Sequence, residues 1–361
     1  MQWTSRMLDN DRKTEIVRRI DDAVRGHCNL SDITRTSEDV RYAADVLWER
    51  IKHLQVASNT VRKEATWNLL EQTCLEHNIL PREFYLDRIE TTRDKAVQRD
   101  YKPHSIEGIG EVHTAKWGKT AVALKRFFFS VKTAEEPQAN DQDSKIHKAF
   151  SRTALRLSLL KHKNVQEFLG VCCDAPPLSQ TICMVTPWCP RKDIEVYVSI
   201  LENDSQQQQE VVPLINNWVR EIAVGLAYLH DQGVTHGNLH LGNILIDEEG
   251  CARLTDFGLE WIAEAAKRTR GPSSHPRGGP YQYMAPEQLN PEAFGIVILA
   301  PTFSSDMYAY ACACYQLYAA QLPFQELTMT ESTKSVLKGV KPSRPIAAGK
   351  EILEKDQRHM M

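Results

Sequence analysis

Residues 234–246, VTHGNLHLGNILI, have the pattern of a loop that delivers a catalytic carboxylate and, five positions later, an amide that binds a metal ion. The amide is present as Asn243, but the carboxylate position holds Asn238. An asparagine side chain donates and accepts hydrogen bonds, yet it cannot take a proton from a hydroxyl group and carries no negative charge. The pattern therefore leaves open whether the chain is an enzyme or only keeps an enzyme's framework.

Four more short motifs surround this loop in a fixed order. GIGEV and VALK precede it, and DFG and MAPE follow it, so that the motifs occupy Gly108–Val112, Val122–Lys125, Asp256–Gly258 and Met284–Glu287. Each motif alone is a weak signal. Their order, together with their expected places on strands and loops, makes the combination specific.

Together the motifs resemble the signature set of protein kinases over residues 105–345, with the tyrosine-kinase-like branch as the nearest in character. The segments LPREFYLDRIE and HPRGGPYQYMAPE are also similar to kinase-like proteins of mushroom-forming fungi. The resemblance implies an α+β, bilobal protein-kinase-like fold, with a β-rich N-lobe and a helical C-lobe. It also implies ATP and Mg²⁺ as cofactors, because the family moves the ATP γ-phosphate to protein hydroxyl groups.

The resemblance assigns a role to individual residues. Asn243 and Asp256 would hold Mg²⁺, and Lys125 would bind the ATP phosphates. In the hinge segment, Thr186–Cys189, Pro187 would offer its carbonyl and Cys189 its N–H to adenine. The alternative for the apolar positions is ordinary core packing. Ala123 and Leu245 would cover the two faces of adenine. The remaining nucleotide-binding positions are Gly108, Gly110, Val112 and the gatekeeper Thr186.

Several positions depart from the kinase pattern. A GxGxxGxV frame ending at Val112 puts Ser105 and Glu107 where the first two glycines belong, and the glutamate would bring negative charge toward phosphate. Thr153 holds the place of the glutamate that pairs with the lysine, so Lys125 lacks its usual anchor. The glycine loop, the lysine anchor and the base are altered together, which favours a pseudokinase.

Two further departures flank Asn238. His240 stands at the place of the family's loop lysine, and Gly237 replaces the arginine that clamps a phosphorylated activation loop in many kinases. We therefore expect no switching through that phosphate–arginine pairing.

Apolar periodicity predicts the elements that must position these residues, beginning with a helical segment over residues 8–96. Its second helix is expected to begin with Ser37 as the cap, and a third is expected to run from Ser58 or Asn59 toward Leu75. Such a segment either packs on its neighbour or binds a partner, and the sequence leaves these alternatives open.

The rest of the chain alternates between strands and helices. Residues 105–130 alternate as strands, 131–145 form a polar loop, and 149–162 return to helical spacing. TICMVTPW, residues 181–188, is predicted as a buried strand, and residues 215–233 as an amphipathic helix. The predicted domains are a helical domain at 1–96, a protein-kinase-like domain at 105–345 (N-lobe about 105–188, C-lobe about 189–345) and a tail at 346–361.

The carboxyl-terminal part resembles the family only as far as residue 345. Its SSDMYAYACACYQLYAAQLPF segment carries Asp306 at the place of the family's buried aspartate. The residues that follow 345 are too few for the last two helices, so we expect a shortened C-lobe with exposed apolar surface and a Glu287 without its arginine. Such a chain should associate or unfold at modest temperature. A truncated or wrongly spliced gene product is an alternative.

Composition limits the partners and the compartment. The 361 residues include 44 basic and 47 acidic ones, with a net charge of -3 and no block of like charge, so neither nucleic acid nor a membrane surface is expected as a partner. No apolar stretch approaches the roughly 18 residues of a membrane span, and Gln2 occupies the place where myristoylation requires glycine. The nine cysteines lack paired CxxC spacing and are expected to be reduced thiols of a soluble cytoplasmic or nuclear protein.

The sequence therefore predicts a helical domain followed by a kinase-like fold that acts as a binding or scaffold module in signalling. Protein partners would bind the helical domain and the lobes, and ATP with Mg²⁺ would bind weakly or not at all. One alternative is an active serine/threonine kinase, since Lys125, Asn243 and Asp256 are intact. The other is a nonfunctional remnant, which should lack a cooperative unfolding transition.

Overall fold

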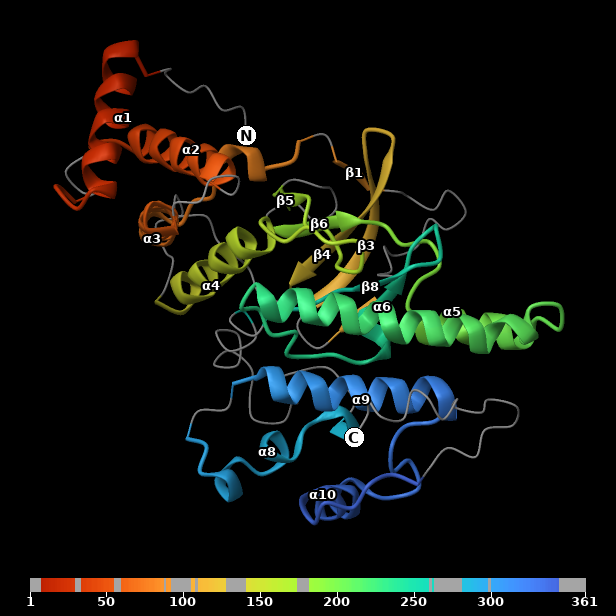
Figure 1. The fold of residues 1–361 in the computed structure, drawn as a ribbon. Helices are drawn as coiled ribbons and strands as arrows, with labels where there is room; N and C mark the ends of the chain where they lie inside the picture. The colour runs from red at the N-terminus through yellow and green to blue at the C-terminus, as the bar shows by residue number, and fades with distance from the viewer. Residues whose placement is uncertain are drawn as a thin grey trace. The chain divides into compact units, whose positions relative to one another are not determined.

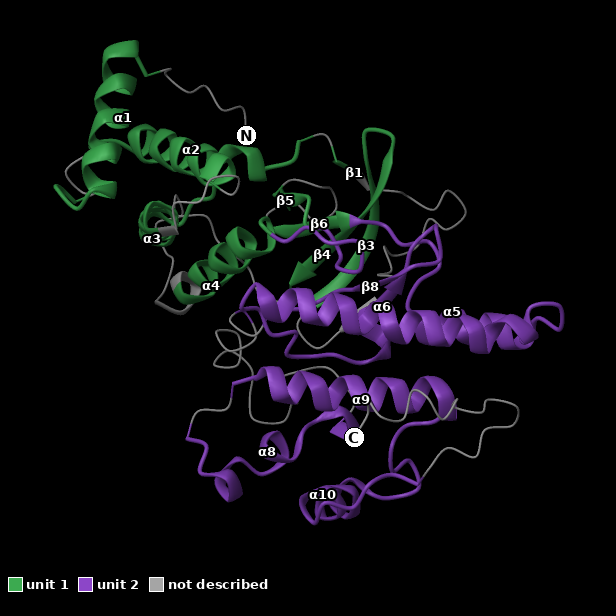
Figure 2. Ribbon diagram, in the orientation of Figure 1, with its two compact units in different colours: residues 1–106, 110–159, 168–186 green, residues 107–109, 160–167, 187–361 purple. Residues whose placement is uncertain are grey.

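The chain forms two compact units, one built on a sheet and one mainly helical (Figure 2). Unit 1 comprises residues 1–106, 110–159 and 168–186, and unit 2 comprises 107–109, 160–167 and 187–361. This division confirms the predicted α+β fold with a β-rich lobe and a helical lobe. The computed structural model describes residues 8–29, 34–54, 60–87, 89–91, 105–107, 110–127, 141–173, 182–259, 262, 281–297 and 300–343.

Three helices open unit 1, as the periodicity predicts (Figure 1). They are α1 (Asn10–Val24), α2 (Ser37–Leu54) and α3 (Thr60–His77). The cap of α2 is Thr36 and not the predicted Ser37. The Asp39 N–H donates to Thr36 Oγ1 (3.2 Å), and the Thr36 N–H donates to the Asp39 carboxylate (3.1 Å), a reciprocal pair that satisfies two backbone donors at the helix start.

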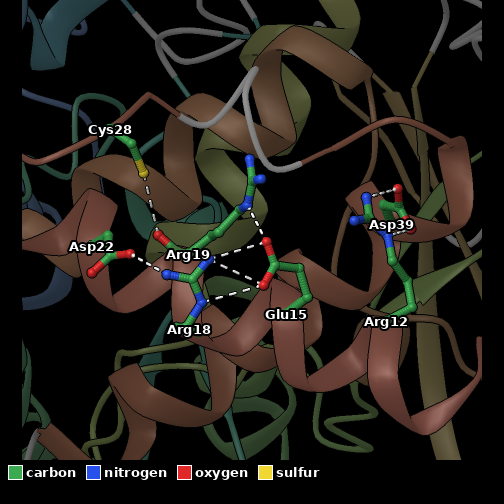
Figure 3. Close-up of polar contacts among 7 residues, drawn as sticks. All are labelled: Arg12, Glu15, Arg18, Arg19, Asp22, Cys28 and Asp39. Atoms are coloured by element: carbon green, nitrogen blue, oxygen red, sulfur yellow. Dashed lines mark hydrogen bonds and ion pairs between the residues drawn. The ribbon is translucent and has the colours of Figure 1, made fainter.

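Asp39 also fastens α1 to α2 (Figure 3). Its carboxylate is buried and accepts hydrogen bonds from Arg12 Nε (3.2 Å) and Nη2 (2.6 Å). The hydrogen bond from Arg12 is the main cause that lowers the pKa of Asp39. Farther along α1, Arg18 pairs with Glu15 (3.1 Å) and Asp22 (3.3 Å) on the exposed side. The Arg12–Asp39 pair links α1 to α2, as does the pair of Arg50 Nη1 with Asp21 Oδ1 at 3.0 Å, so these two pairs constrain the helix packing more than the pairs within α1 do.

The connection from the helices to the sheet corrects the helical prediction for residues 8–96. After α3 come the short 3-10 turn η2 (Arg82–Phe84) and strand β1 (Ile89–Thr91), so helix ends at His77. The turn is packed on both sides, because the Phe84 ring lies 5.0 Å from that of Trp48 and the Leu86 N–H donates to the Val171 carbonyl (2.9 Å). The helices and the sheet thus belong to one unit, and the domain boundary between residues 96 and 105 stays a prediction.

The sheet of unit 1 has six strands in the order β1-β3-β4-β6-β5, with β2 also paired to β3. One face carries the core cluster, which includes Val122, Leu124 and Val185. The β3–β4 hairpin turns at Gly118 and Lys119. The strands after β1 are β2 (Ser105–Glu107), β3 (Gly110–Trp117), β4 (Thr120–Phe127), β5 (Gly170–Cys172) and β6 (Cys183–Pro187).

Helix α4 (Asp141–Leu157) packs on the sheet and on α3. It begins earlier than predicted, since residues 141–145 belong to the helix and not to a polar loop. Their polar side chains hide the helix from a search for apolar periodicity. The Phe150 ring meets Phe127 of β4 edge-on at 5.9 Å, and Arg152 Nε pairs with Glu71 of α3 at 2.6 Å. Helix α4 is therefore held by both the sheet and the amino-terminal helices.

Unit 2 is built around α6 (Val211–Asp231), whose buried stripe includes Trp218, Ile222 and Leu226 as the amphipathic pattern predicts. Helices α6 and α9 lie side by side (Figure 1). The other elements are α5 (Ile194–Asn203), η3 (Gln208–Glu210), η4 (Leu241–Asn243), β7 (Ile244–Ile246), β8 (Ala252–Leu254), η5 (Tyr281–Tyr283), α8 (Pro286–Leu289), η6 (Pro291–Phe294), α9 (Phe303–Ala319) and α10 (Met329–Leu337).

Two predictions about the whole chain can be compared with these elements. All nine cysteines are free thiols, as predicted, and most of them are buried. Across the described residues, no helix combines the length and the apolar character that a membrane span requires.

Candidate functional site

Four predicted nucleotide-binding residues lie on one face of the unit 1 sheet. The register pairs Val112 of β3 with Lys125 of β4, and Ala123 lies two positions before Lys125 on the same side. Thr186 of β6 alternates with Val185, which packs into the core cluster on the other face. The structure therefore brings Val112, Ala123, Lys125 and Thr186 together, although the sequence spreads them over three strands.

The glycine-rich segment is described only in part. Gly110 begins β3 opposite Phe127, and a Cβ at this position would lie 2.5 Å from the Arg126 carbonyl oxygen. A glycine is thus required for the two strands to approach, whatever its role toward phosphate. Gly108 lies outside the described residues.

The lysine and its expected anchor are both in unit 1. Lys125 is 8% exposed, and Thr153 of α4 is 1% exposed. The Thr153 hydroxyl makes no hydrogen bond among the residues that the structure describes. Thr153 therefore gives Lys125 neither a charge nor a hydrogen bond, which removes the glutamate's function from this position.

The loop of unit 2 holds Asn243, whose amide the sequence predicts to be a metal ligand. Asn243 is fully buried, and its Nδ2 donates to the Asn238 backbone carbonyl at 2.8 Å. Its Oδ1 points away from that bond and has no partner among the described residues. A buried amide oxygen without a donor is costly unless another ligand meets it, and amide oxygens suit Mg²⁺. Asn243 therefore fits a magnesium ligand, while Asn238 contributes only its backbone.

A short link joins this loop to the second predicted metal ligand. The Thr255 N–H donates to the Asn243 carbonyl at 3.0 Å, directly before Asp256. Asp256 has φ of 60°, a left-handed conformation that aspartate tolerates better than most residues. The backbone hydrogen bond and the left-handed conformation thus fix the position of the Asp256 Cα relative to Asn243.

Asp306 of α9 holds the backbone of this loop at residues 236 and 237. Its side chain is buried, as the resemblance implies. Its carboxylate accepts from the His236 N–H (2.7 Å), the Gly237 N–H (2.8 Å) and His230 Nε2 (2.9 Å). Gly237 has φ of 76°, where a side chain would be strained, so glycine suits this backbone as well as removing the arginine. The sequence pointed to Asp306 but not to the three donors that it holds.

His236 is buried in this loop. Its ring is 1% exposed and meets the Phe257 ring edge-on at 6.2 Å. Burial lowers the pKa of His236, because charging the imidazole inside the protein costs solvation energy. A buried ring whose pKa is lowered is a weak proton acceptor, so His236 is a poor substitute for the missing base.

Leu245 of β7 is less buried than the residues on either side of it, as the alternation of side chains along a strand predicts. Ile244 and Ile246 are fully buried, whereas Leu245 is half-buried and pairs with Arg253 of β8. Its side chain therefore points away from the core that the two isoleucines form.

The hinge segment is in contact with Gln166, a residue that the sequence prediction missed. Gln166 Nε2 donates to the Pro187 carbonyl at 2.6 Å, and the Cys189 thiol donates to Gln166 Oε1 at 3.7 Å. Burial raises the pKa of Cys189 to about 11, so its sulfur carries the proton that this contact needs. The hydrogen bond joins residues 21 positions apart, and no local pattern in the sequence could have indicated it.

Comparisons with known proteins match the part of the chain that holds these residues. A family model described as "Protein tyrosine and serine/threonine kinase" matches residues 108–356. The serine/threonine/tyrosine-protein kinase HT1 of Arabidopsis thaliana is 27% identical over 203 residues, which cover 56% of this chain and 47% of that protein. The serine/threonine-protein kinase STY46 of the same plant is 26% identical over 205 residues, covering 56% and 32%.

The chain is also similar to a kinase from a yeast. The probable serine/threonine-protein kinase C70.05c of Schizosaccharomyces pombe is 28% identical over 215 residues, which cover 57% of this chain and 26% of the relative. In all three alignments the chain spans less than half the length of the relative.

Proposed function

The chain belongs to the protein tyrosine and serine/threonine kinase family, and from this premise we propose that it is a pseudokinase. It binds protein partners in signalling through its amino-terminal helices and its kinase-like lobes, and it transfers phosphate poorly or not at all. The proposal includes membership of the tyrosine-kinase-like branch and the likeness to kinase-like proteins of mushroom-forming fungi.

Asn238 is the observation that carries the proposal. In the family, a carboxylate at this position accepts the proton of the hydroxyl group that attacks phosphate. Asn238 keeps the backbone role of the position, because its carbonyl accepts from Asn243, but its side chain offers no base. A missing general base costs about 10² to 10⁴ in rate.

The altered lysine anchor adds to this loss. The buried Thr153 hydroxyl has no hydrogen-bond partner among the described residues, so it does not orient the Lys125 ammonium. A misaligned phosphate forfeits a further factor of about 10². The two losses act on the same step and together support absent or very slow transfer.

Weak nucleotide binding is part of the proposal. Asn243 and Asp256 would hold Mg²⁺, Lys125 would meet the phosphates, and Cys189 would give its N–H to the adenine ring. The metal, when bound, supplies positive charge that neutralises the phosphate oxygens. The unpartnered oxygen of Asn243 supports this assignment. Exposed apolar side chains support partner binding, since Phe303 and Met307 lie one turn apart on α9 and are each about half exposed.

The nucleotide assignment predicts that ATP with Mg²⁺ stabilises the unaltered chain and that Lys125→Ala or Asp256→Ala abolishes the effect. At ten times the dissociation constant, a ligand adds about 1.4 kcal/mol to the free energy of unfolding, which corresponds to a shift of a few degrees in melting temperature. Thermal melting with and without Mg²⁺ measures this shift.

Lys119→Ala is the matched control, because Lys119 is exposed in the β3–β4 turn. It should respond to ATP as the unaltered chain does. Equal shifts in Lys119→Ala, Lys125→Ala and Asp256→Ala would remove the site assignment.

The rival function is an active serine/threonine kinase. The geometry of Asn243 favours it, since the amide still presents its oxygen as a metal ligand would. Transfer of phosphate by the unaltered chain, absent in Lys125→Ala, would establish the rival and reject the pseudokinase.

A further inference from the structure

Gln166 makes contact with both residues through which the hinge segment would read adenine. Its side chain is only 4% exposed, its Nε2 reaches the Pro187 carbonyl at 2.6 Å, and its Oε1 accepts from the Cys189 thiol at 3.7 Å. The donor and the acceptor of one amide group are thus both engaged by the segment. Adenine presents a similar pair along one edge, an amino donor beside a ring-nitrogen acceptor.

The backbone holds Gln166 firmly in this position. Its N–H donates to the Leu254 carbonyl of β8 at 2.8 Å, and the neighbouring Val165 forms a parallel bridge with the same residue. Asn164 Nδ2 donates to the Ala252 carbonyl at 2.9 Å. Residues 164–166 are therefore fixed along β8, and the Gln166 side chain extends from a rigid support.

We infer that Gln166 removes the selectivity of the hinge segment for the 6-amino group of adenine. A binding site prefers a ligand that carries a donor group mainly because the protein's buried acceptor would stay unpaired with a ligand that lacks it. The Pro187 carbonyl already accepts from Gln166, so omitting the 6-amino group leaves no unpaired acceptor. Purine nucleotides with and without this group should bind alike. The inference rests on the proposed nucleotide site and identifies the residue that sets its base specificity.

The experiment compares the dissociation constants of two Mg²⁺ complexes, ATP and purine riboside triphosphate, which lacks only the 6-amino group. Titration calorimetry should give the unaltered chain a ratio within about twofold, since the carbonyl is satisfied in either complex. Gln166→Leu frees the carbonyl, so its ratio should rise to at least about fivefold in favour of ATP. Gln166→Met, which has a similar length and also lacks the amide, should show the same rise and takes the place of Gln166→Leu if the branched side chain disturbs folding.

Gln232→Leu is the matched control, because Gln232 is exposed at the end of α6. Its ratio should equal that of the unaltered chain. A ratio of fivefold or more in the unaltered chain, or one that Gln166→Leu and Gln166→Met leave unchanged, overturns the inference. If the unaltered chain binds neither nucleotide, the inference falls together with the nucleotide site, whereas a ratio of fivefold or more overturns the inference and leaves the site standing.

The result is separable from that of the proposed function. Rapid phosphate transfer by the unaltered chain would reject the pseudokinase, while the ratio of the two dissociation constants would still report on Gln166.

Discussion

Restoring both missing carboxylates, as Asn238→Asp with Thr153→Glu, should raise phosphate transfer by more than the product of the two single effects. Each reversion alone should give less than about tenfold, and the pair about 10² to 10³. The base can act only on a hydroxyl aligned with phosphate, and a carboxylate at position 153 would orient the Lys125 ammonium toward the phosphate. Such interdependent residues show non-additive effects.

Transfer of radiolabelled phosphate by the unaltered chain, by each single variant and by the double variant measures how far the two effects depend on each other. Thr153→Gln in place of Thr153→Glu is the matched control, because it has nearly the same shape and no charge. Combined with Asn238→Asp, it should add nothing beyond the single reversion. If Asn238→Asp alone reaches the rate of the double variant, the lysine anchor has no part in the defect.

The substitution Asp306→Ala should lower the free energy of unfolding by about 3–5 kcal/mol. The variant leaves the N–H groups of His236 and Gly237 without their acceptor in the interior, and it also removes the partner of His230. A buried donor that loses its partner costs far more than the net value of one hydrogen bond.

Urea unfolding of the variant and of Asp231→Asn tests this expectation. Asp231 is exposed at the end of α6, so its replacement should change the free energy by less than about 0.5 kcal/mol. A loss below about 1 kcal/mol in Asp306→Ala would show that the three contacts do not support the loop.

The sequence predicted the elements whose apolar spacing is regular. Helices α1, α2 and α6 bury one stripe each, and the strands β3 and β4 alternate, so local pattern and burial agree. The start of α4 and the strand β1 were missed. The first turn of α4 is polar, and a strand of three residues is too short to show a period.

The candidate site was predictable as a set of positions but not as a set of contacts. The motifs placed Lys125, Asn243 and Asp256, because each occupies a fixed offset within a short pattern. Gln166 and the donors of Asp306 depend on residues brought together from distant parts of the chain. Such contacts follow from the packing of β8 and α9, which no spacing rule encodes.

Phosphate transfer by the unaltered chain is the measurement that tests the pseudokinase most directly. Radiolabelled ATP is supplied with Mg²⁺ or Mn²⁺ to the purified protein and a generic basic acceptor protein, and Lys125→Ala serves as the control for contaminating kinase. The loss of the base at Asn238 and of the anchor at Thr153 predicts the same incorporation in both proteins. Robust incorporation by the unaltered chain that disappears in Lys125→Ala would contradict the pseudokinase and identify an active kinase.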